Sequence, residues 1–417
     1  MSSRMMSLQG LNERACRLNS YISDIITPCV TMRLGRRRKG DDQMDFEFNE
    51  EQATLREISR SALLTHSSPA HVRSLAESGH DVDDKLWRLG TDLGWTGLAI
   101  GEDFGGSGQS LVELCIVAEE LGRALAAGPF ITSSLVGLAV ERFGSDTIKD
   151  ELLPRLADGS FRATWALAEP RGAWTPASVT TNAIATDGDY ILHGRKTAVQ
   201  DAGSSNGILV SAVLGGAPAL FMVDPASTGV TLRKQKTLDE SRSFYEIDFD
   251  NVRVGGGRRL EVDASAVQWL CDAAAVLTSA DSLGAGQRLM EMTVDYVKVR
   301  EQFDRAIGSF QAVKHKISDM AIGVKGTFAA TYYAAMSLDL GSPDASRDAT
   351  VAKSFSSDAM SRLAGQALQS HGGIGFTWEH DLHLYLRRVK TDETLYGDTP
   401  AHQERLAALL IDDRPAT

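Results

Sequence analysis

The chain has 417 residues, of which 43% are hydrophobic and 24% charged, an ordinary composition for a soluble globular protein of two or three packed domains. Its net charge of −12 argues against a nucleic-acid partner, because phosphate binding needs clustered Lys and Arg. Four scattered cysteines and nine histidines show no metal-ligand spacing, which indicates a reducing, cytoplasmic setting without a bound metal. No apolar run approaches the roughly 20 residues that span a bilayer.

Residues 1–43 differ from the rest of the chain and carry a basic cluster at 33–39. Three interpretations remain open: an upstream extension, a flexible tail, or a mitochondrial-type leader, which the acidic Glu13 and Asp24 weaken. We expect a disordered extension. From Met44 the sequence resembles the start of a protein chain and leads into a predicted helix, with Asn49 as its predicted cap.

The rest of the chain predicts three domains in the order α, β, α. Helical spacing dominates residues 44–160, where the glycine-rich run 94–108 is best interpreted as a tight turn, since it does not follow a strand and no Lys-Ser/Thr follows it. Residues 161–260 alternate with period two between turn signals, which predicts an antiparallel β-domain, either a sandwich or a barrel. Residues 261–412 return to long, nearly uninterrupted helical patterns, which predict a four-helix bundle.

Several motifs, in order and at sensible spacings, resemble the acyl-CoA dehydrogenase family over nearly all of residues 44–412. They are Gly94-Trp95 through Gly108, Glu119 to Arg123, Arg300 to Gln311, Gln369 to Phe376, Arg387 to Lys390, and Leu395 to Pro400. The resemblance implies a fold of N-terminal helices, a middle β-domain and a C-terminal bundle. It also implies FAD as cofactor and oxidation of the Cα–Cβ bond of an acyl-CoA, with electron-transfer flavoprotein or a similar protein as acceptor.

In this family each FAD lies between two subunits, so the resemblance assigns its binding residues to two groups. The group that reaches into a neighbour looks intact and consists of Arg300, Phe303, Phe310, Gln311, Gln369, Gly372 and Gly373. One departure is Asp304, where the family prefers glycine, because a carboxylate there would repel the pyrophosphate unless it points away. His371 is expected to support the adjacent turn.

The group that holds the chain's own flavin ring looks eroded. Ala168 and Thr399 fall at cofactor positions, but Ala168 replaces the family's threonine and the Gly-Ser-Asp that should follow is missing. The strand at 194–200 lacks the tryptophan that flanks the ring and ends in Gln200 instead of threonine. We therefore expect flavin binding to be weakened on this side.

The catalytic carboxylate is missing from both places where the family puts it. Gly397 stands at the usual glutamate, and the alternative helical position falls on Ala274. Asp272 and Asp281 are near in sequence but are expected to point elsewhere on the helix. Asp398 is the best substitute base, although it lies one residue past the site and has a shorter side chain. A minor possibility is that His402 reaches the acyl site.

Three hypotheses follow from this pattern. In the first, the chain is the base-lacking subunit of a heterotetramer with a competent paralogue. In the second, it is a self-sufficient dehydrogenase that forms homotetramers and uses Asp398 as its base. In the third, it is a non-enzymatic family member. The retained neighbour-facing motifs favour the first. By analogy alone, such pairs act on bulky acyl-CoAs, sterol side chains among them.

Overall fold

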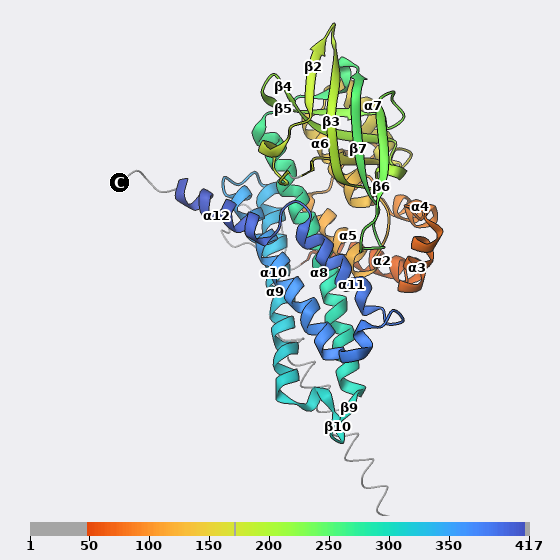
Figure 1. Cartoon of the computed structure of the whole chain (residues 1–417), viewed down its shortest axis with the longest axis vertical. Coiled ribbons are helices and arrows are strands. Elements are labelled where there is room, and N and C mark those ends of the chain that lie inside the picture. Colours follow the sequence, from red (N-terminus) through yellow and green to blue (C-terminus); the bar gives the residue numbers. More distant parts are fainter. Residues whose placement is uncertain (1–47, 171, 413–417) are drawn as a thin grey trace, which may run out of the picture.

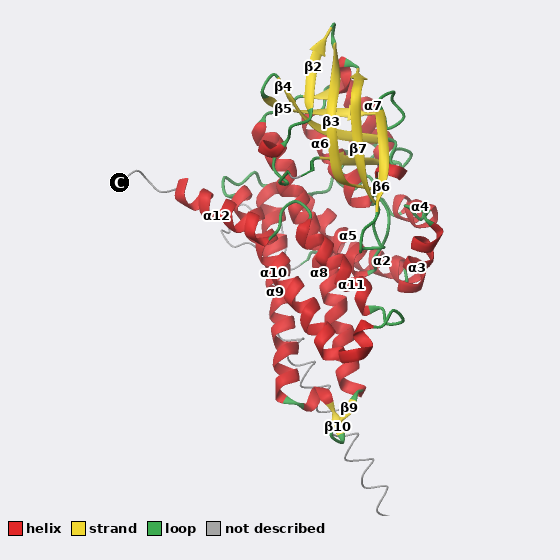
Figure 2. Ribbon diagram, viewed as in Figure 1, coloured by secondary structure: helices red, strands yellow, loops and turns green. Residues whose placement is uncertain are grey.

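The computed structural model describes residues 48–170 and 172–412, so the predicted extension, residues 1–43, lies outside the described ranges. The β-sheet lies at one end of the molecule and a long helical bundle extends away from it (Figures 1 and 2). The N-terminal helices pack where the two meet. The order α, β, α is therefore confirmed.

Helices make up the N-terminal part of the described chain. They are α2 (Glu50–His66), α3 (Pro69–Ser78), α4 (Asp84–Asp92), α5 (Leu111–Arg123), α6 (Phe130–Phe143) and α7 (Asp146–Ala157). The predicted cap is confirmed: the Asn49 side chain accepts a hydrogen bond from the Gln52 backbone N–H at 2.8 Å, and the Gln52 side chain accepts one from Asn49 at 3.1 Å. Two backbone donors that the helix leaves open are thereby satisfied. The run 94–108 forms turns and a short 3₁₀-helix, Glu102–Phe104, as expected.

The middle part is one mixed sheet rather than the wholly antiparallel domain that the alternation predicted. Its strands are β1 (Ala163–Ala166), β2 (Asn182–Thr186), β3 (Asp189–Gln200), β4 (Gly207–Leu214), β5 (Ala217–Val223), β6 (Val230–Gln235), β7 (Phe244–Val254) and β8 (Arg259–Leu260). The order is β6-β7-β3-β2-β4-β5-β8, with β1 on β4. Most neighbours are antiparallel, but β4 runs parallel to both β1 and β2. Period two reports burial on one face and carries no strand direction.

The C-terminal part is built from long helices. They are α8 (Ala264–Val299), α9 (Gln311–Asp339), α10 (Ala345–His371), α11 (Leu382–Thr394) and α12 (Thr399–Asp412), and the hairpin of β9 (Glu301–Gln302) and β10 (Arg305–Ala306) joins α8 to α9. Helices α8 to α11 pack together as the predicted bundle, and α12 packs on α10. Helix α5 lies so close to α8 that a Cβ at Gly284 would stand 1.7 Å from the Glu119 carbonyl oxygen.

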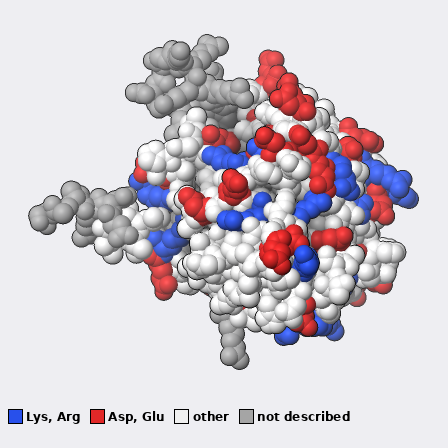
Figure 3. All heavy atoms as spheres, turned by 90° about the horizontal axis from the view of Figure 1, so that it is seen from above, with Lys and Arg blue, Asp and Glu red and all other residues white. Residues whose placement is uncertain are grey.

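One hydrophobic core joins the N-terminal helices to the bundle, and a second, smaller core lies within the sheet. No helix within residues 48–412 has the length and apolar character needed to cross a membrane. In the same described residues, His, Cys, Asp and Glu side chains form no group of three that could hold a metal ion. On the face seen in Figure 3, basic side chains are interspersed with acidic ones.

Candidate active site

The position of the missing base is occupied by a neighbouring side chain. Gly397 has φ of 106°, a backbone conformation that residues with a Cβ rarely adopt. A Cβ placed there would lie 2.9 Å from Nε2 and 3.1 Å from Cδ2 of the His402 imidazole. Two features therefore oppose a larger residue at 397: the backbone angle and the ring of His402.

His402 is held in this place by burial and by a hydrogen bond. Its side chain is 5% exposed, and Nε2 donates to the Tyr396 carbonyl oxygen at 3.0 Å. Burial lowers the pKa of the imidazole to about 4, so the ring is neutral at pH 7. Its Nδ1 is buried and has no hydrogen-bond partner among the described residues. The donor of His402 is thus used to fix the backbone of the segment that should carry the base.

Lys353 holds the same segment from the other side. This lysine is 1% exposed, and its Nζ donates to the carbonyl oxygens of Asp392 at 2.6 Å and Glu393 at 3.2 Å and to the Ser357 hydroxyl at 2.9 Å. It thereby satisfies carbonyls that the end of α11 leaves open. Burial lowers the pKa of its ammonium group to about 8. The sequence analysis missed Lys353, although a lysine on a buried helix face is a usable signal.

The candidate base Asp398 lies at the start of α12. Its side chain is exposed, and Oδ1 accepts a hydrogen bond from the Ala401 backbone N–H at 3.0 Å. This is the geometry of a helix cap. Beside it, the Thr399 hydroxyl is buried and has no hydrogen-bond partner within the described residues.

The carboxylates near the alternative base position are both paired. Ala274 itself is fully buried. Asp272 accepts from Arg405 at 2.6 Å and from the Ser346 hydroxyl at 2.6 Å. Asp281 accepts two hydrogen bonds from Arg388, at 2.8 and 2.7 Å, and one from Arg242 at 2.8 Å. Neither carboxylate is free to take a proton from a substrate.

These charges belong to a buried network between the sheet and the bundle. Burial opposes the ionisation of Asp281, but Arg388 and Arg242 outweigh it and lower its pKa to about 2. Arg242 also contacts Asp392 at 2.6 Å, and burial raises the pKa of Asp392 well above its usual range. Arg388 and Asp392 lie one turn apart on α11, whereas Asp281 belongs to α8 and Arg242 precedes β7, so the fold brings three parts of the chain together.

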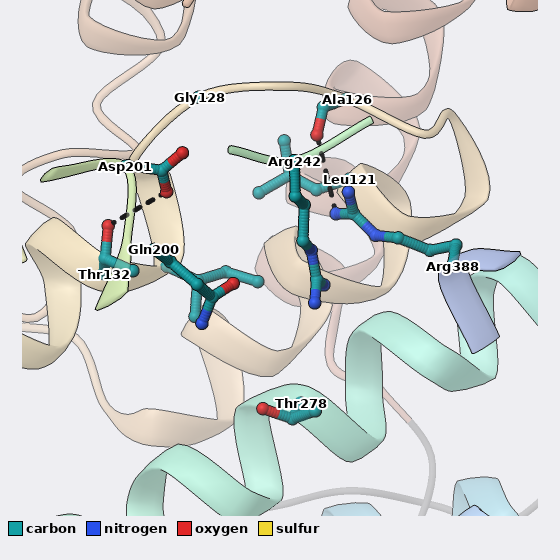
Figure 4. Close-up of a pocket in the computed structure, with 10 residues that line it drawn as sticks. Leu121, Ala126, Gly128, Thr132, Gln200, Asp201, Arg242, Thr278 and Arg388 are labelled. Carbon is teal, nitrogen blue, oxygen red and sulfur yellow. Dashed lines mark hydrogen bonds between the residues drawn. The ribbon is translucent and has the colours of Figure 1, made fainter. Parts of the chain in front are cut away.

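A small cavity adjoins this network, with Arg242 lying between Gln200 and Arg388 in the view of Figure 4. Its volume is about 20 Å³, enough for about one water molecule. Asp201 lines it and accepts a hydrogen bond from the Thr132 hydroxyl at 3.4 Å, and burial raises the pKa of this carboxyl to about 7. A cavity of this size leaves no room for an acyl chain.

Aromatic rings close the neighbouring space. Tyr396 is 5% exposed and stacks on Trp165, with 6.1 Å between the ring centroids. Trp174 packs on the same tyrosine at 5.0 Å. Trp174 belongs to the segment that replaces the family's Gly-Ser-Asp, so this departure in sequence adds bulk over Tyr396.

The strand at 194–200 shows how the missing tryptophan is replaced. Gln235 accepts a hydrogen bond from the Ala198 backbone N–H at 3.0 Å and donates to the Thr197 hydroxyl at 3.0 Å. The Ala168 carbonyl oxygen accepts from the Thr197 N–H at 2.9 Å, so its backbone is used within the domain. The polar side chain of Gln235 thus covers the position where the family has an aromatic ring.

The neighbour-facing residues lie elsewhere, toward the end of the bundle. The β9–β10 hairpin is at the end farthest from the sheet (Figure 1), and its turn residues Phe303 and Asp304 have φ of 56° and 59°. Phe303 is 87% exposed. Phe310 lies behind it, with 6.1 Å between the ring centroids, and carries the Arg305 guanidinium at 4.0 Å.

The polar members of this group are free to contact another molecule. Arg300, Gln311 and Gln369 are exposed, and their side chains make no hydrogen bond or ion pair with the described residues. His371 stacks on Tyr296 at 4.5 Å, which places the turn at Gly372 and Gly373 beside the C-terminal half of α8. The fold therefore separates this group from Ala168 and Thr399 and brings the two groups together in no single-chain site.

This arrangement fits a cofactor shared between chains. Free, exposed donors on one surface suit an anionic pyrophosphate presented by a neighbour. On the chain's own ring side, Gln235 instead binds the backbone of Ala198, and Trp174 packs on Tyr396.

Comparison with known proteins defines the class. The family models of the acyl-CoA dehydrogenase N-terminal, middle and C-terminal domains match residues 49–160, 164–252 and 264–411, respectively. The chain belongs to the acyl-CoA dehydrogenase family, which confirms the predicted fold and, at the level of the family, a flavin-dependent oxidoreductase.

Individual relatives narrow the comparison. The chain is 31% identical to the acyl-CoA dehydrogenase IpdE2 of Mycolicibacterium smegmatis over 362 residues, which cover 87% of this chain and 99% of the relative. It is 30% identical to FadE27 of Mycobacterium tuberculosis over 378 residues, 88% of this chain and 99% of that protein.

Among solved structures, a chain of the ChsE4–ChsE5 complex of Mycobacterium tuberculosis superposes with a TM-score of 0.83 at 29% identity, covering 89% of this chain and all of that one. A chain of the Tcur3481–Tcur3483 steroid acyl-CoA dehydrogenase variant superposes with a TM-score of 0.81 at 29% identity, covering 87% and 98%. The first structure is named a complex of ChsE4 and ChsE5, and the name of the second joins Tcur3481 and Tcur3483.

Proposed function

We propose that this chain is the base-lacking subunit of a heteromeric, FAD-dependent acyl-CoA dehydrogenase. The observation that carries the proposal is the closed base position, where the His402 ring stands 2.9 Å from the Cβ that any side chain at Gly397 would need. A proton next to a thioester is removed only by a positioned base. The catalytic glutamate must therefore come from a partner subunit.

The relatives support the heteromer and suggest the substrate class. One similar structure is named the ChsE4–ChsE5 complex, and another, named for Tcur3481 and Tcur3483 together, is called a steroid acyl-CoA dehydrogenase. We infer a sterol-derived acyl-CoA as substrate and electron-transfer flavoprotein or a similar protein as acceptor. Both cysteines within the described residues, Cys115 and Cys271, are free and buried, which fits the reducing cytoplasm.

The exposed group at the far end of the bundle gives this chain its part in the reaction. FAD, when bound, supplies the acceptor for the hydride that leaves the β-carbon. Arg300 offers a fixed positive charge to the pyrophosphate, and Gln311 and Gln369 offer hydrogen bonds. Phe303, at the hairpin tip, would cover apolar surface of the cofactor. These side chains would bind and orient the FAD, and the partner subunit would hold the flavin ring and supply the catalytic base.

FAD content tests the proposal. The chain is purified alone and after co-expression with a glutamate-bearing paralogue, and visible absorbance is compared with protein concentration. We expect little flavin in the chain alone and near-stoichiometric flavin in a complex that oxidises acyl-CoA. Stoichiometric flavin in the lone chain, reduced by acyl-CoA, would instead support a self-sufficient enzyme and direct attention to Asp398. No flavin in either preparation would support a non-enzymatic member.

A further inference from the structure

Side chains from two helices, α10 and the following α12, fix the backbone on both sides of Gly397. Lys353 of α10 binds the last carbonyl groups of α11, and His402 of α12 binds the Tyr396 carbonyl oxygen. Between these anchors Tyr396 has φ of 57° and Gly397 has φ of 106°. Positive φ costs little at a glycine, but at Tyr396 it is strained unless the surroundings hold it. The conformation of the segment is therefore imposed by its neighbours.

His402 opposes a side chain at 397 in two ways. Its ring occupies the space of the Cβ, and its hydrogen bond orients the peptide that follows Tyr396. A flexible ring usually moves away from a new neighbour at little cost. Here the ring is 5% exposed and would lose its hydrogen bond inside the protein, and a buried polar group without a partner costs free energy.

We propose that His402 is a positioning residue that keeps the base position of this chain closed, so that restoring glutamate at 397 is not sufficient to place a carboxylate there. Two features then deprive residue 397 of a catalytic base: glycine stands where the family has glutamate, and the His402 ring blocks a side chain there. This inference deepens the proposed function and rests on it for its meaning, but its geometry concerns this chain alone.

A double-mutant cycle on the purified single chain tests the contact. Gly397→Ala and Gly397→Glu are each made with His402, His402→Gln and His402→Ser, and the urea midpoint of unfolding is measured. Gln retains the bulk and a donor that reaches the Tyr396 carbonyl, whereas Ser removes the bulk and its hydroxyl is too short to reach that carbonyl. We expect Gly397→Ala and Gly397→Glu to lower the midpoint with His402 or Gln, and to lower it by less than half as much with Ser.

Gly79→Ala is the matched control. Gly79 also has positive φ, 73°, but its Cβ would meet no atom within 4 Å. Its substitution reports backbone strain without a clash, so its effect is expected to be the same in all three backgrounds. The proposal is overturned if substitutions at 397 lower the midpoint equally in all three backgrounds, because the cost would then come from the backbone angle alone.

The coupling between residues 397 and 402 and the proposed function are tested by independent experiments. No flavin, partner or acyl-CoA is present in the unfolding experiment, so an absent coupling leaves the heteromeric reading as it was. Conversely, a chain that proves to bind flavin alone would refute the heteromer while leaving a measured coupling between 397 and 402 in place.

Discussion

The candidate site residues are buried at one end of this molecule and exposed at the other. Near the sheet, His402 fills the space beside Gly397 and Trp174 packs on Tyr396, next to a network of buried charges. At the far end of the bundle, Arg300 and Phe303 are exposed and ready to contact another molecule. Loss of function alone does not explain why the base position is blocked while the exposed cofactor-binding residues at the other end are retained. The difference supports the proposal that one half of the site serves a complex with a partner subunit.

The largest effect is expected from opening the closed end. Asp281→Asn removes the negative charge between Arg388 and Arg242, and leaving such buried cations unpaired costs about 3–5 kcal/mol. Urea unfolding measures the loss. Asp189→Asn, which alters an exposed ion pair with Arg253, is the control and should change the midpoint little. Equal effects of the two substitutions would show that the network does not hold the closed end.

The next effect concerns the pH dependence of the closed end. The pKa of His402 is lowered from 6.5 to about 4 in the folded chain. The unfolded chain therefore binds a proton first as pH falls below 6.5, and stability from this group is lost between pH 6.5 and 4, by up to about 3 kcal/mol. Stability is measured across this range.

His402→Gln removes the titrating group and keeps a donor for Tyr396. The difference between wild type and variant cancels other groups, including Asp201, whose raised pKa acts in the opposite direction. Parallel curves for the two proteins would contradict a neutral, buried His402.

At the far end of the bundle, Arg300→Ala is expected to weaken FAD binding by the co-expressed complex without destabilising the lone chain. Losing a charged hydrogen bond costs about 1.5–3 kcal/mol, which corresponds to roughly a 10- to 100-fold rise in Kd. Flavin fluorescence measures the binding. Arg362→Ala, at an exposed pair with Asp358 on α10, is the control. If both substitutions leave the Kd unchanged, Arg300 takes no part in binding the cofactor.

The smallest effect is expected at Asp398. Asp398→Ala removes the cap of α12 and should cost about 1 kcal/mol of stability, whereas Asp398→Asn should largely retain it. Neither change should slow flavin reduction by acyl-CoA in the complex, which is measured by stopped flow. Loss of reduction in both variants would identify Asp398 as the base and the chain as self-sufficient.

Much of the architecture follows from local pattern. Period two predicted the strands at 190–194 and 244–249, and near-heptad spacing predicted the bundle, because each records burial along a single element. Several motifs in order, from Gly94–Gly108 to Leu395–Pro400, indicated the family. The same pattern could not give the parallel pairing of β4 with β1 and β2, since strand direction is set by how the chain returns to the sheet.

The sequence by itself determined that a glutamate is absent at 397 and that a tryptophan is absent at 198, since both follow from residue identity within a motif. Only the tertiary structure decided what fills the space. Lys353 lies on another helix, about 40 residues before the carbonyls it binds, and Gln235 reaches Ala198 from a different strand. Such contacts depend on packing between elements that are distant in sequence, and the identity of a residue carries no record of which neighbour occupies its space.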